Sequence, residues 1–304
     1  MNREPPRDLE VMVRHILPPV TLRKYVTRIF LTEISLPEGE AVEDLLFPDW
    51  TGFHFYKLSN PRGETLAGRL DSDTIFSVIG ARSRGLPFQA TSLRQWGFGL
   101  HPLGWTRLVG AQASDYVDRV CDGRVEPAFA RFSPLADTLF DDTRDPAGEF
   151  ARMIRFLEDL PETSNANETL LIETFLATRD ADIATVEALA EQVGCSRRTL
   201  ERLCKRSFGF PPKILLSRQR FMRSLSGFVT NPSSTWTDAI DPRYHDQAHF
   251  VRDFRRFMGM TPTEYAEMAK PIAQPSMLER ARLRLELERA FQGSTASAFY
   301  GVDL

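Results

Sequence analysis

The sequence is poor in the residues that build metal centres, disulfides and membrane spans. Its 304 residues include three cysteines, Cys121, Cys195 and Cys204, and five histidines. The cysteines lack metal-type spacing and no His-x-His or HExxH motif occurs, so reduced thiols in a cytoplasm are favoured over disulfides or a zinc site. No apolar run approaches the roughly 20 residues of a membrane-spanning helix. We therefore expect a cytoplasmic protein without a metal centre or cofactor.

Motifs of the commoner enzyme classes are also missing. The glycine-rich stretch from Gly85 to Gly104 contains neither GxGxxG nor GK[ST]. His54 and His101 suggest a metal-dependent cupin enzyme, but such a site needs about three or four converging ligands. No spaced His/Glu set accompanies these two histidines. The sequence therefore favours a protein that is not an enzyme.

The N-terminal part has the pattern of a β-rich domain. At roughly 150 residues per domain the chain is long enough for two domains, and 42% hydrophobic and 26% charged residues are typical of globular proteins. Between Tyr25 and Gly110, the segments YVTRIFLTEISL, GFHFYKL, DTIFSVIG and RQWGFGL read as short strands bounded by turn residues. We predict an α+β N-terminal domain, a sandwich or barrel with helices.

Helical periodicity follows the predicted strands. The apolar spacing predicts a helix across residues 104–123, further helices across 150–160 and 168–178, and an amphipathic helix from 277 to 291 that packs against a domain or a second protomer. The predicted organisation has four parts. They are a sensory or dimerisation domain at 1–130, a helical linker region at 131–180, a DNA-binding domain at 181–270 and a helical tail at 271–304.

Charge is unevenly distributed along the chain. Residues 183–270 hold 14 Lys and Arg against 9 Asp and Glu, whereas the whole chain has a net charge of −3. The rest of the chain is therefore strongly acidic. A basic segment on an acidic body suggests that the segment binds a polyanion.

The basic segment begins with two helices at the spacing of a helix-turn-helix. The first has its apolar face at Ile183, Val186, Leu189, Ala190 and Val193. Gly194 can adopt the left-handed conformation that ends a helix, and Ser196 is a suitable N-cap for a second helix. That second helix has an apolar stripe of Leu200, Leu203, Cys204 and Phe208, with five Arg and Lys between residues 197 and 206. An isolated cationic helix is more often a solvated face, but the adjacent turn favours a recognition helix.

With these features the chain resembles the AraC/XylS family of bacterial transcription activators. The segment VEALAEQVGCSRRTLERLCKRSFGFPPK is similar to the family's first unit, with its alanine helix, Gly-x-Ser turn, Arg-x-Leu-x-Arg helix and Gly-x-x-Pro exit. A long helix around ILLSRQRFMRSL follows. The segment YHDQAHFVRDFRRFMGMTPTEY is similar to the family's second unit, and together the motifs cover about 85 residues.

The resemblance implies seven helices that place two recognition helices in successive major grooves of promoter DNA. It also implies RNA polymerase as a partner, a homodimer and a possible small-molecule effector. Base-reading positions would be Arg198, Glu201, Arg202, Gln247, Ala248 and Arg252. Phosphate-binding positions would be Ser196, Arg197, Lys205, Arg206, Arg255 and Arg256.

One segment departs from the family pattern. Where the family has a helix followed by glycine and an aromatic residue, this chain reads TDAIDPRYHD. Pro242 disfavours helix before it, and Arg243 stands in place of a glycine that is expected to need a positive φ. We therefore expect the first helix of the second unit to be short or distorted.

The N-terminal domain offers aromatic side chains for an apolar effector, although aromatic residues in strands are more often plain core. These candidates are Trp50, Phe53, Phe55, Tyr56, Trp96 and Trp105. The sequence therefore predicts a DNA-binding transcriptional regulator modulated by a ligand or by dimerisation. The alternative is a DNA-binding protein whose N-terminal domain is an enzyme or a ligand-independent interaction module.

Overall fold

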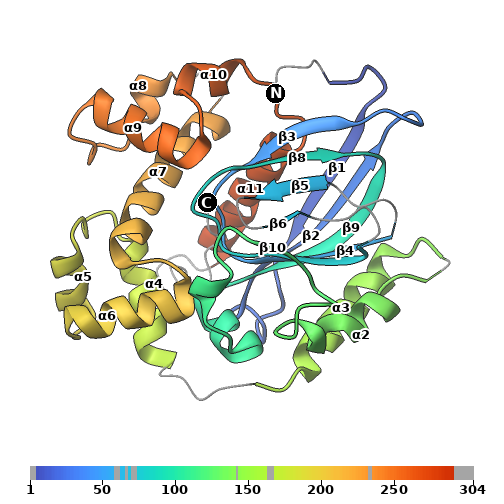
Figure 1. Ribbon diagram of the computed structural model, residues 1–304, viewed down its shortest axis with the longest axis horizontal. Coiled ribbons are helices and arrows are strands. Elements are labelled where there is room, and N and C mark those ends of the chain that lie inside the picture. Colours follow the sequence, from blue (N-terminus) through green and yellow to red (C-terminus); the bar gives the residue numbers. More distant parts are fainter. Residues whose placement is uncertain are drawn as a thin grey trace.

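A sheet-rich N-terminal region and a helical C-terminal region make up the protein (Figure 1). The computed structural model describes residues 5–57, 62–65, 68–69, 74–141, 143–162, 168–231 and 235–290. Two sheets face each other in the N-terminal region, and the helices α4 to α10 lie beside them. The predicted fold class, an α+β domain followed by an all-α domain with two helix-turn-helix units, is confirmed.

The larger sheet is antiparallel with strand order β1-β2-β9-β4-β7-β10. Its strands are β1 (Glu10–Ile16), β2 (Val26–Ser35), β4 (Gly52–Tyr56), β7 (Phe76–Ile79), β9 (Leu93–Leu100) and β10 (Val120–Asp122). The four segments predicted from the sequence as strands correspond to β2, β4, β7 and β9. The smaller sheet has the order β3-β8-β5-β6. Its strands are β3 (Val42–Leu46), β8 (Leu86–Ala90), β5 (Arg62–Thr65) and β6 (Gly68–Arg69).

Alternation along the central strand β4 separates two environments. Phe53 and Phe55 point to the outer face of the larger sheet, where Phe53 contacts Phe132 at a ring-centroid distance of 4.6 Å. His54 and Tyr56 point the other way and line a cavity between the sheets. Successive side chains of a strand point to opposite faces, so this one segment supplies both the outer core and the cavity wall.

Helices cover the outer face of the larger sheet. They are η3 (Ala130–Phe132), α2 (Ser133–Thr138) and α3 (Pro146–Asp159). Glu149 of α3 is 1% exposed, and its carboxylate accepts hydrogen bonds from Arg94 and, at 2.7 Å, from the indole of Trp96. This buried pair fixes α3 against β9, because a buried charge needs a partner.

The helix predicted across residues 104–123 is wrong. The segment forms α1 (Pro102–Gly104), a π-helical turn η1 (Trp105–Val109), a 3-10 turn η2 (Ala113–Asp115) and strand β10. Gly110 ends the first part with φ 78°, and Val120 to Asp122 pair with β7 instead of continuing a helix. The apolar spacing matched a helix, but pairing with an open sheet edge decided the structure of its end.

The described part of the C-terminal region consists of helices joined by loops. Its helices are α4 (Glu168–Arg179), α5 (Val186–Gln192), α6 (Arg197–Leu203), η4 (Cys204–Phe208), α7 (Pro212–Thr230), α8 (Trp236–Ala239), α9 (Gln247–Met258), α10 (Pro262–Glu267) and α11 (Ala273–Ala290). The predicted helices at 150–160, 168–178 and in the long linker correspond to α3, α4 and α7. In Figure 1, α7 runs from the α5–α6 pair to the α8–α9 pair.

Both helical units pack against the N-terminal region. Leu189, Leu200 and Phe208 of the first unit belong to the same apolar core as Phe53 and Trp96. The core of the second unit includes Leu45 from β3 and Phe47, which directly follows that strand. Both units therefore share apolar cores with residues of the N-terminal region.

The tail helix α11 returns to the N-terminal region. It contacts β1, β3 and α7. The helix predicted from residue 277 therefore packs against a domain of the same chain, which was one of the two predicted arrangements. Asp44 of β3 accepts hydrogen bonds from the backbone N–H groups of Ile272 and Ala273, at 2.7 and 2.8 Å, and so caps the start of the helix. The predicted stretch beyond 290 lies outside the described residues. In the described parts of the chain no helix is long and apolar enough to cross a membrane.

Candidate nucleic-acid interface and internal cavity

The first helix-turn-helix unit has a regular turn. Thr185 caps α5 and Ser196 caps α6, with its hydroxyl accepting from the backbone N–H of Thr199 at 3.2 Å. Gly194 has φ +64°, a conformation that side chains with a Cβ rarely adopt. Both sequence predictions for this turn, the glycine and the cap, are confirmed.

Helix α6 and the turn η4 that continues it bury an apolar stripe and expose their cations. Leu200 and Cys204 are 0% exposed. The outward-facing residues are Arg197, Arg198, Arg202, Lys205 and Arg206. Arg197 forms ion pairs with Glu187, at 2.9 Å, and with Glu201, at 3.1 Å. A residue predicted to bind phosphate, Arg197, is therefore paired with a residue predicted to read a base, Glu201. In the described part of the chain the other four cations form no ion pair.

The second unit starts with a helix of four residues, α8, as predicted from Pro242. Thr235 and Asp238 form a capping box around it. Trp236 stacks on Phe228 of α7 at a centroid distance of 3.7 Å, and its indole donates to the carbonyl of Pro262 at 3.0 Å. Aromatic packing and a hydrogen bond therefore hold a helix that is too short to be stable by itself.

The loop between α8 and α9 is organised by a carboxylate. Asp241 is 6% exposed and accepts from the Nε of Arg223, at 2.5 Å, and from the backbone N–H of Arg243, at 2.9 Å. The expectation of a positive φ at Arg243 is wrong, since among the described non-glycine residues that conformation occurs at Asp118. The loop does not need a left-handed residue at this position, because hydrogen bonds to the carboxylate of Asp241 stabilise its turn.

Helix α9 repeats the arrangement of α6. Its cap Asp246 accepts from the backbone N–H of His249 at 2.6 Å. Its buried face is Phe250, Phe254, Phe257 and Met258. Its exposed side chains are Gln247, Ala248, Arg252, Arg255 and Arg256. All of the predicted base and phosphate positions on this helix are therefore exposed to solvent.

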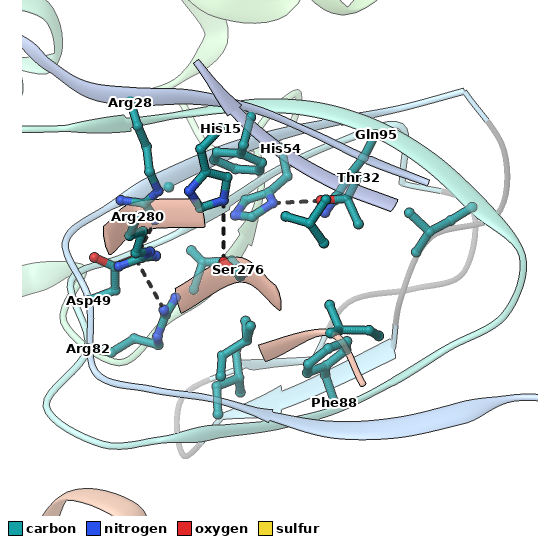
Figure 2. A pocket seen from close by; sticks show the side chains of 18 of the residues that line it. His15, Arg28, Thr32, Asp49, His54, Arg82, Phe88, Gln95, Ser276 and Arg280 are labelled. Carbon is teal, nitrogen blue, oxygen red and sulfur yellow. Dashed lines mark hydrogen bonds and ion pairs between the residues drawn. The ribbon is translucent and has the colours of Figure 1, made fainter. Parts of the chain in front are cut away.

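A cavity of about 90 Å³ lies between the two sheets and is closed on one side by α11 (Figure 2). Of the predicted effector contacts, Trp50 and Tyr56 line it. The other candidates do not. Phe53, Phe55, Trp96 and Trp105 are buried in the core that faces the outer helices. Strand alternation explains this difference for the residues of β4 and β9.

One end of the cavity carries charge. Arg28 donates to the carboxylate of Asp49 at 2.6 Å, Arg280 of α11 donates to the same oxygen, and the Nη2 of Arg82 lies 3.8 Å from it (Figure 2). We call these four residues the guanidinium cluster. Each is at most 6% exposed. The three cations hold the pKa of Asp49 well below its usual range, against the opposing effect of burial.

The remaining polar lining is neutral. Burial lowers the pKa of His54 to about 3 and also lowers that of His15. His54 contacts the side-chain oxygen of Gln95 at 3.4 Å, and His15 contacts the hydroxyl of Ser276 at 3.3 Å. In the described residues no group of three or more His, Cys, Asp or Glu side chains could hold a metal ion.

Residues 189–268 match the family model described as a helix-turn-helix domain. They form an AraC-type helix-turn-helix domain. The match spans both helical pairs, from within α5 to just past α10. No curated protein matches the chain.

Similar solved structures share little sequence with this protein. ToxT from Vibrio cholerae is 10% identical, covers 86% of this chain and 99% of its own, and has a TM-score of 0.42. Wild-type ToxT from the same organism with a bound unsaturated fatty acid is 11% identical, covers 89% and 99%, and has a TM-score of 0.39. The AraC-like transcriptional activator CuxR is 13% identical, covers 67% and 83%, and has a TM-score of 0.26. These likenesses are too weak to assign a function.

Direct contacts join the cavity to the AraC-type domain. Trp50 lies 6.0 Å, centroid to centroid, from Phe208 at the end of η4. The guanidinium of Arg218 in α7 stacks 3.8 Å from the Trp50 ring and donates to the backbone carbonyl of Asp49 at 3.2 Å. Phe47 belongs to the core of the second unit. Sequence reasoning missed these cavity residues because Arg28, Asp49, Arg82 and Arg280 form no local motif.

Proposed function

We propose that this protein is a sequence-specific DNA-binding regulator of transcription in which both helix-turn-helix units read promoter DNA. The observation that carries the proposal is that α6 and α9 each bury an apolar stripe and expose a row of cations. An α-helix fits the major groove, and arginine binds guanine bidentately, so two such helices suit two adjacent grooves.

Base reading and phosphate binding divide along each helix. Arg198, Glu201 and Arg202 in α6, and Gln247 and Arg252 in α9, are proposed to contact bases. The proposed phosphate contacts are Ser196, Arg197, Lys205, Arg206, Arg255 and Arg256. Phosphate contacts fix position and base contacts give specificity, so loss of the two kinds should have different consequences.

Two substitutions, one in α6 and one in the following turn η4, test this division. We expect Arg202→Ala to weaken binding to the preferred site by about 1 to 3 kcal/mol and to leave random DNA nearly unaffected. We expect Lys205→Ala to weaken both about equally and to reduce the salt slope by about one. Footprinting on genomic fragments supplies the site, and titrations at several salt concentrations supply the affinities. Parallel losses on both duplexes for Arg202→Ala would refute a base-reading role.

The N-terminal region is proposed to receive a small-molecule effector in the cavity between its sheets. Three features support this. The cavity is lined by both polar and apolar side chains, α11 closes it, and the segment from Phe47 to Trp50 joins it to both helix-turn-helix units. An effector can shift the activity of the DNA-binding units only if it binds their alternative arrangements with different affinities. DNA affinity measured with and without a bound molecule tests that requirement.

A further inference from the structure

A groove lined by cations lies between the two helix-turn-helix units. It has a volume of about 440 Å³, and its walls come from the starts of α5, α6 and α9, from one side of α7 and from the loop between α8 and α9. Among the described residues that line it, the charged side chains are those of Arg197, Lys213, Arg220, Arg223, Arg243 and a single carboxylate, Glu187. We call it the inter-unit groove. Its lining carries more positive than negative charge.

The starts of both recognition helices border the inter-unit groove. Arg197 is the first residue of α6 and His249 lies in the first turn of α9, and both side chains line the groove. Two recognition helices in successive major grooves on one side of a duplex are separated by a minor groove and the two backbones beside it. A groove that lies between the starts of these helices therefore faces that stretch of backbone.

The cations of the groove differ in how firmly they are held. Arg223 pairs with Asp241, and Arg220 pairs with Asp253. Both carboxylates are buried, so these two arginines are fixed within the fold. Lys213, near the start of α7, is exposed and forms no ion pair with any residue that the structure describes. Lys213 is therefore available to a ligand without the loss of an internal ion pair.

Arg243 joins the two units through a weak contact. Its guanidinium is 30% exposed and pairs with the carboxylate of Asp182, which lies before α5 and is 90% exposed. An exposed ion pair of this kind adds little to stability. A guanidinium donates two parallel hydrogen bonds to a phosphate as well as to a carboxylate. Exchange of Asp182 for a phosphate would therefore cost the protein little.

We propose that the inter-unit groove binds the DNA backbone between the two major grooves. Lys213 and Arg243 each neutralise one phosphate there, and Asp182 occupies Arg243 in the absence of DNA. This inference rests on the DNA-binding function proposed above and adds a third contact region to α6 and α9. It also gives a function to Arg243, the residue that stands in place of the family's glycine. Such a contact fixes the position of the two units on the duplex without reading a base.

Two substitutions with opposite expected signs test the exchange. Arg243→Gln should weaken binding to preferred and random duplexes about tenfold and reduce the salt slope by about one, because one charged phosphate contact is lost. Asp182→Asn should strengthen binding about twofold to fivefold, because it removes the carboxylate that competes with the phosphate. If Arg243 served only to tie the units together through Asp182, both substitutions would weaken binding, and that result would overturn the proposal.

Two further variants separate a local contact from an effect of net charge. Lys213→Gln should also reduce the salt slope by about one. Arg124→Gln is the control, because its guanidinium is 42% exposed beside Asp137 in the N-terminal region, and DNA affinity should stay within about twofold. Equal losses for Arg124→Gln and Arg243→Gln would overturn the proposal. Unchanged salt slopes for both Lys213→Gln and Arg243→Gln would do so as well.

Duplexes with a single methylphosphonate, a neutral replacement for one phosphate, locate the contact of Arg243. The replacement is moved along the backbone between the two footprinted major grooves. Where it removes the contacted phosphate, Arg243→Gln should change affinity by less than about twofold, and elsewhere the roughly tenfold loss should remain. A tenfold loss that persists on every such duplex would show that Arg243 contacts no phosphate in this stretch, contrary to the proposal.

Failure of the groove and failure of the DNA-binding function are distinguishable. Normal binding of the footprinted site that neither Arg243→Gln nor Asp182→Asn changes would overturn the inference and leave the DNA-binding function intact. Failure of the unsubstituted protein to bind any genomic fragment would overturn that function and the inference with it. The Asp182 side chain is 90% exposed, so Asp182→Asn provides a test that does not depend on the folding of Arg243→Gln.

Discussion

The two helix-turn-helix units present similar helices but form their turns by different means. In the first unit, Gly194 takes a left-handed conformation and the hydroxyl of Ser196 caps the next helix. In the second, the buried carboxylate of Asp241 accepts hydrogen bonds from the backbone N–H of Arg243 and from the side chain of Arg223. The carboxylate of Asp246 caps the next helix. The conformational freedom of glycine thus shapes the turn of the first unit, whereas hydrogen bonds to carboxylates shape the turn of the second.

This difference makes the second unit more dependent on charge and on its neighbours. Its loop is tied to α7 through Arg223 and to the segment before α5 through an ion pair between Arg243 and Asp182. The turn of the first unit needs no ion pair, since its conformation follows from glycine. Substitutions at matched positions should therefore have unequal effects on the two units.

The largest effect is expected at the buried carboxylate. Asp241→Ala leaves the partly buried Arg223 and the N–H of Arg243 without their acceptor, and should lower the free energy of unfolding by about 2 to 4 kcal/mol. Urea denaturation measures it. Asp182→Ala is the control, because its 90% exposed side chain makes a surface ion pair with Arg243 worth about 0 to 1 kcal/mol. A loss for Asp241→Ala no greater than for the control would show that the loop does not depend on this carboxylate.

Comparison of Arg202→Ala in α6 with Arg252→Ala in α9 shows whether both units read bases. Both side chains are exposed. If each contacts a base, each substitution should cost about 1 to 3 kcal/mol on the preferred site, at different base pairs. Binding to a panel of single-base variants of the footprinted site locates the two contacts. A loss confined to Arg202→Ala would mean that the second unit only holds the backbone.

A smaller contrast is expected at the turn positions themselves. Gly194→Ala places a Cβ at φ +64° and should cost about 1 kcal/mol of stability, although nothing lies within 4 Å of that Cβ. Arg243→Gly should give no gain, because Arg243 has no positive φ to relieve. Thermal melting of both variants decides the matter. Stabilisation by Arg243→Gly would show that the loop is strained.

The smallest effect is expected at acidic pH, where the carboxylates that cap the helices of the second unit become protonated. The pKa values of Asp238 and Asp246 are lowered, chiefly by the Thr235 side chain and by the backbone N–H of His249, respectively. A carboxyl group with a lowered folded-state pKa stabilises fully above the ordinary value of 3.8, and this contribution is lost as pH falls through the folded-state pKa. The hydroxyl caps Thr185 and Ser196 do not titrate in this range.

Amide NMR shifts during an acid titration from pH 6 check this contrast. Below about pH 4, the first turns of α8 and α9 should fray while those of α5 and α6 persist. Asp246→Ser should make the start of α9 insensitive to pH over this range. Simultaneous fraying of all four helix starts would contradict the difference between the units.

Local pattern predicted much of the fold. The period of apolar residues identified strands β2, β4, β7 and β9 and helices α3, α4 and α7, because each buries one face of a regular element. The caps and glycine of the first turn were readable because a single residue type determines each. The helix across 104–123 was mispredicted because β10 exists only through its pairing with β7.

The sequence by itself determined where charge lies and which helices carry it, since the rows of cations on α6 and α9 follow from spacing along one helix. Tertiary structure decided the cavity. Alternation along β4 requires Phe53 and His54 to point to opposite faces, but does not say which face is enclosed. Arg28, Asp49, Arg82 and Arg280 meet because β2, two loops and the tail helix α11 converge there, and contacts so distant in the chain leave no local signal.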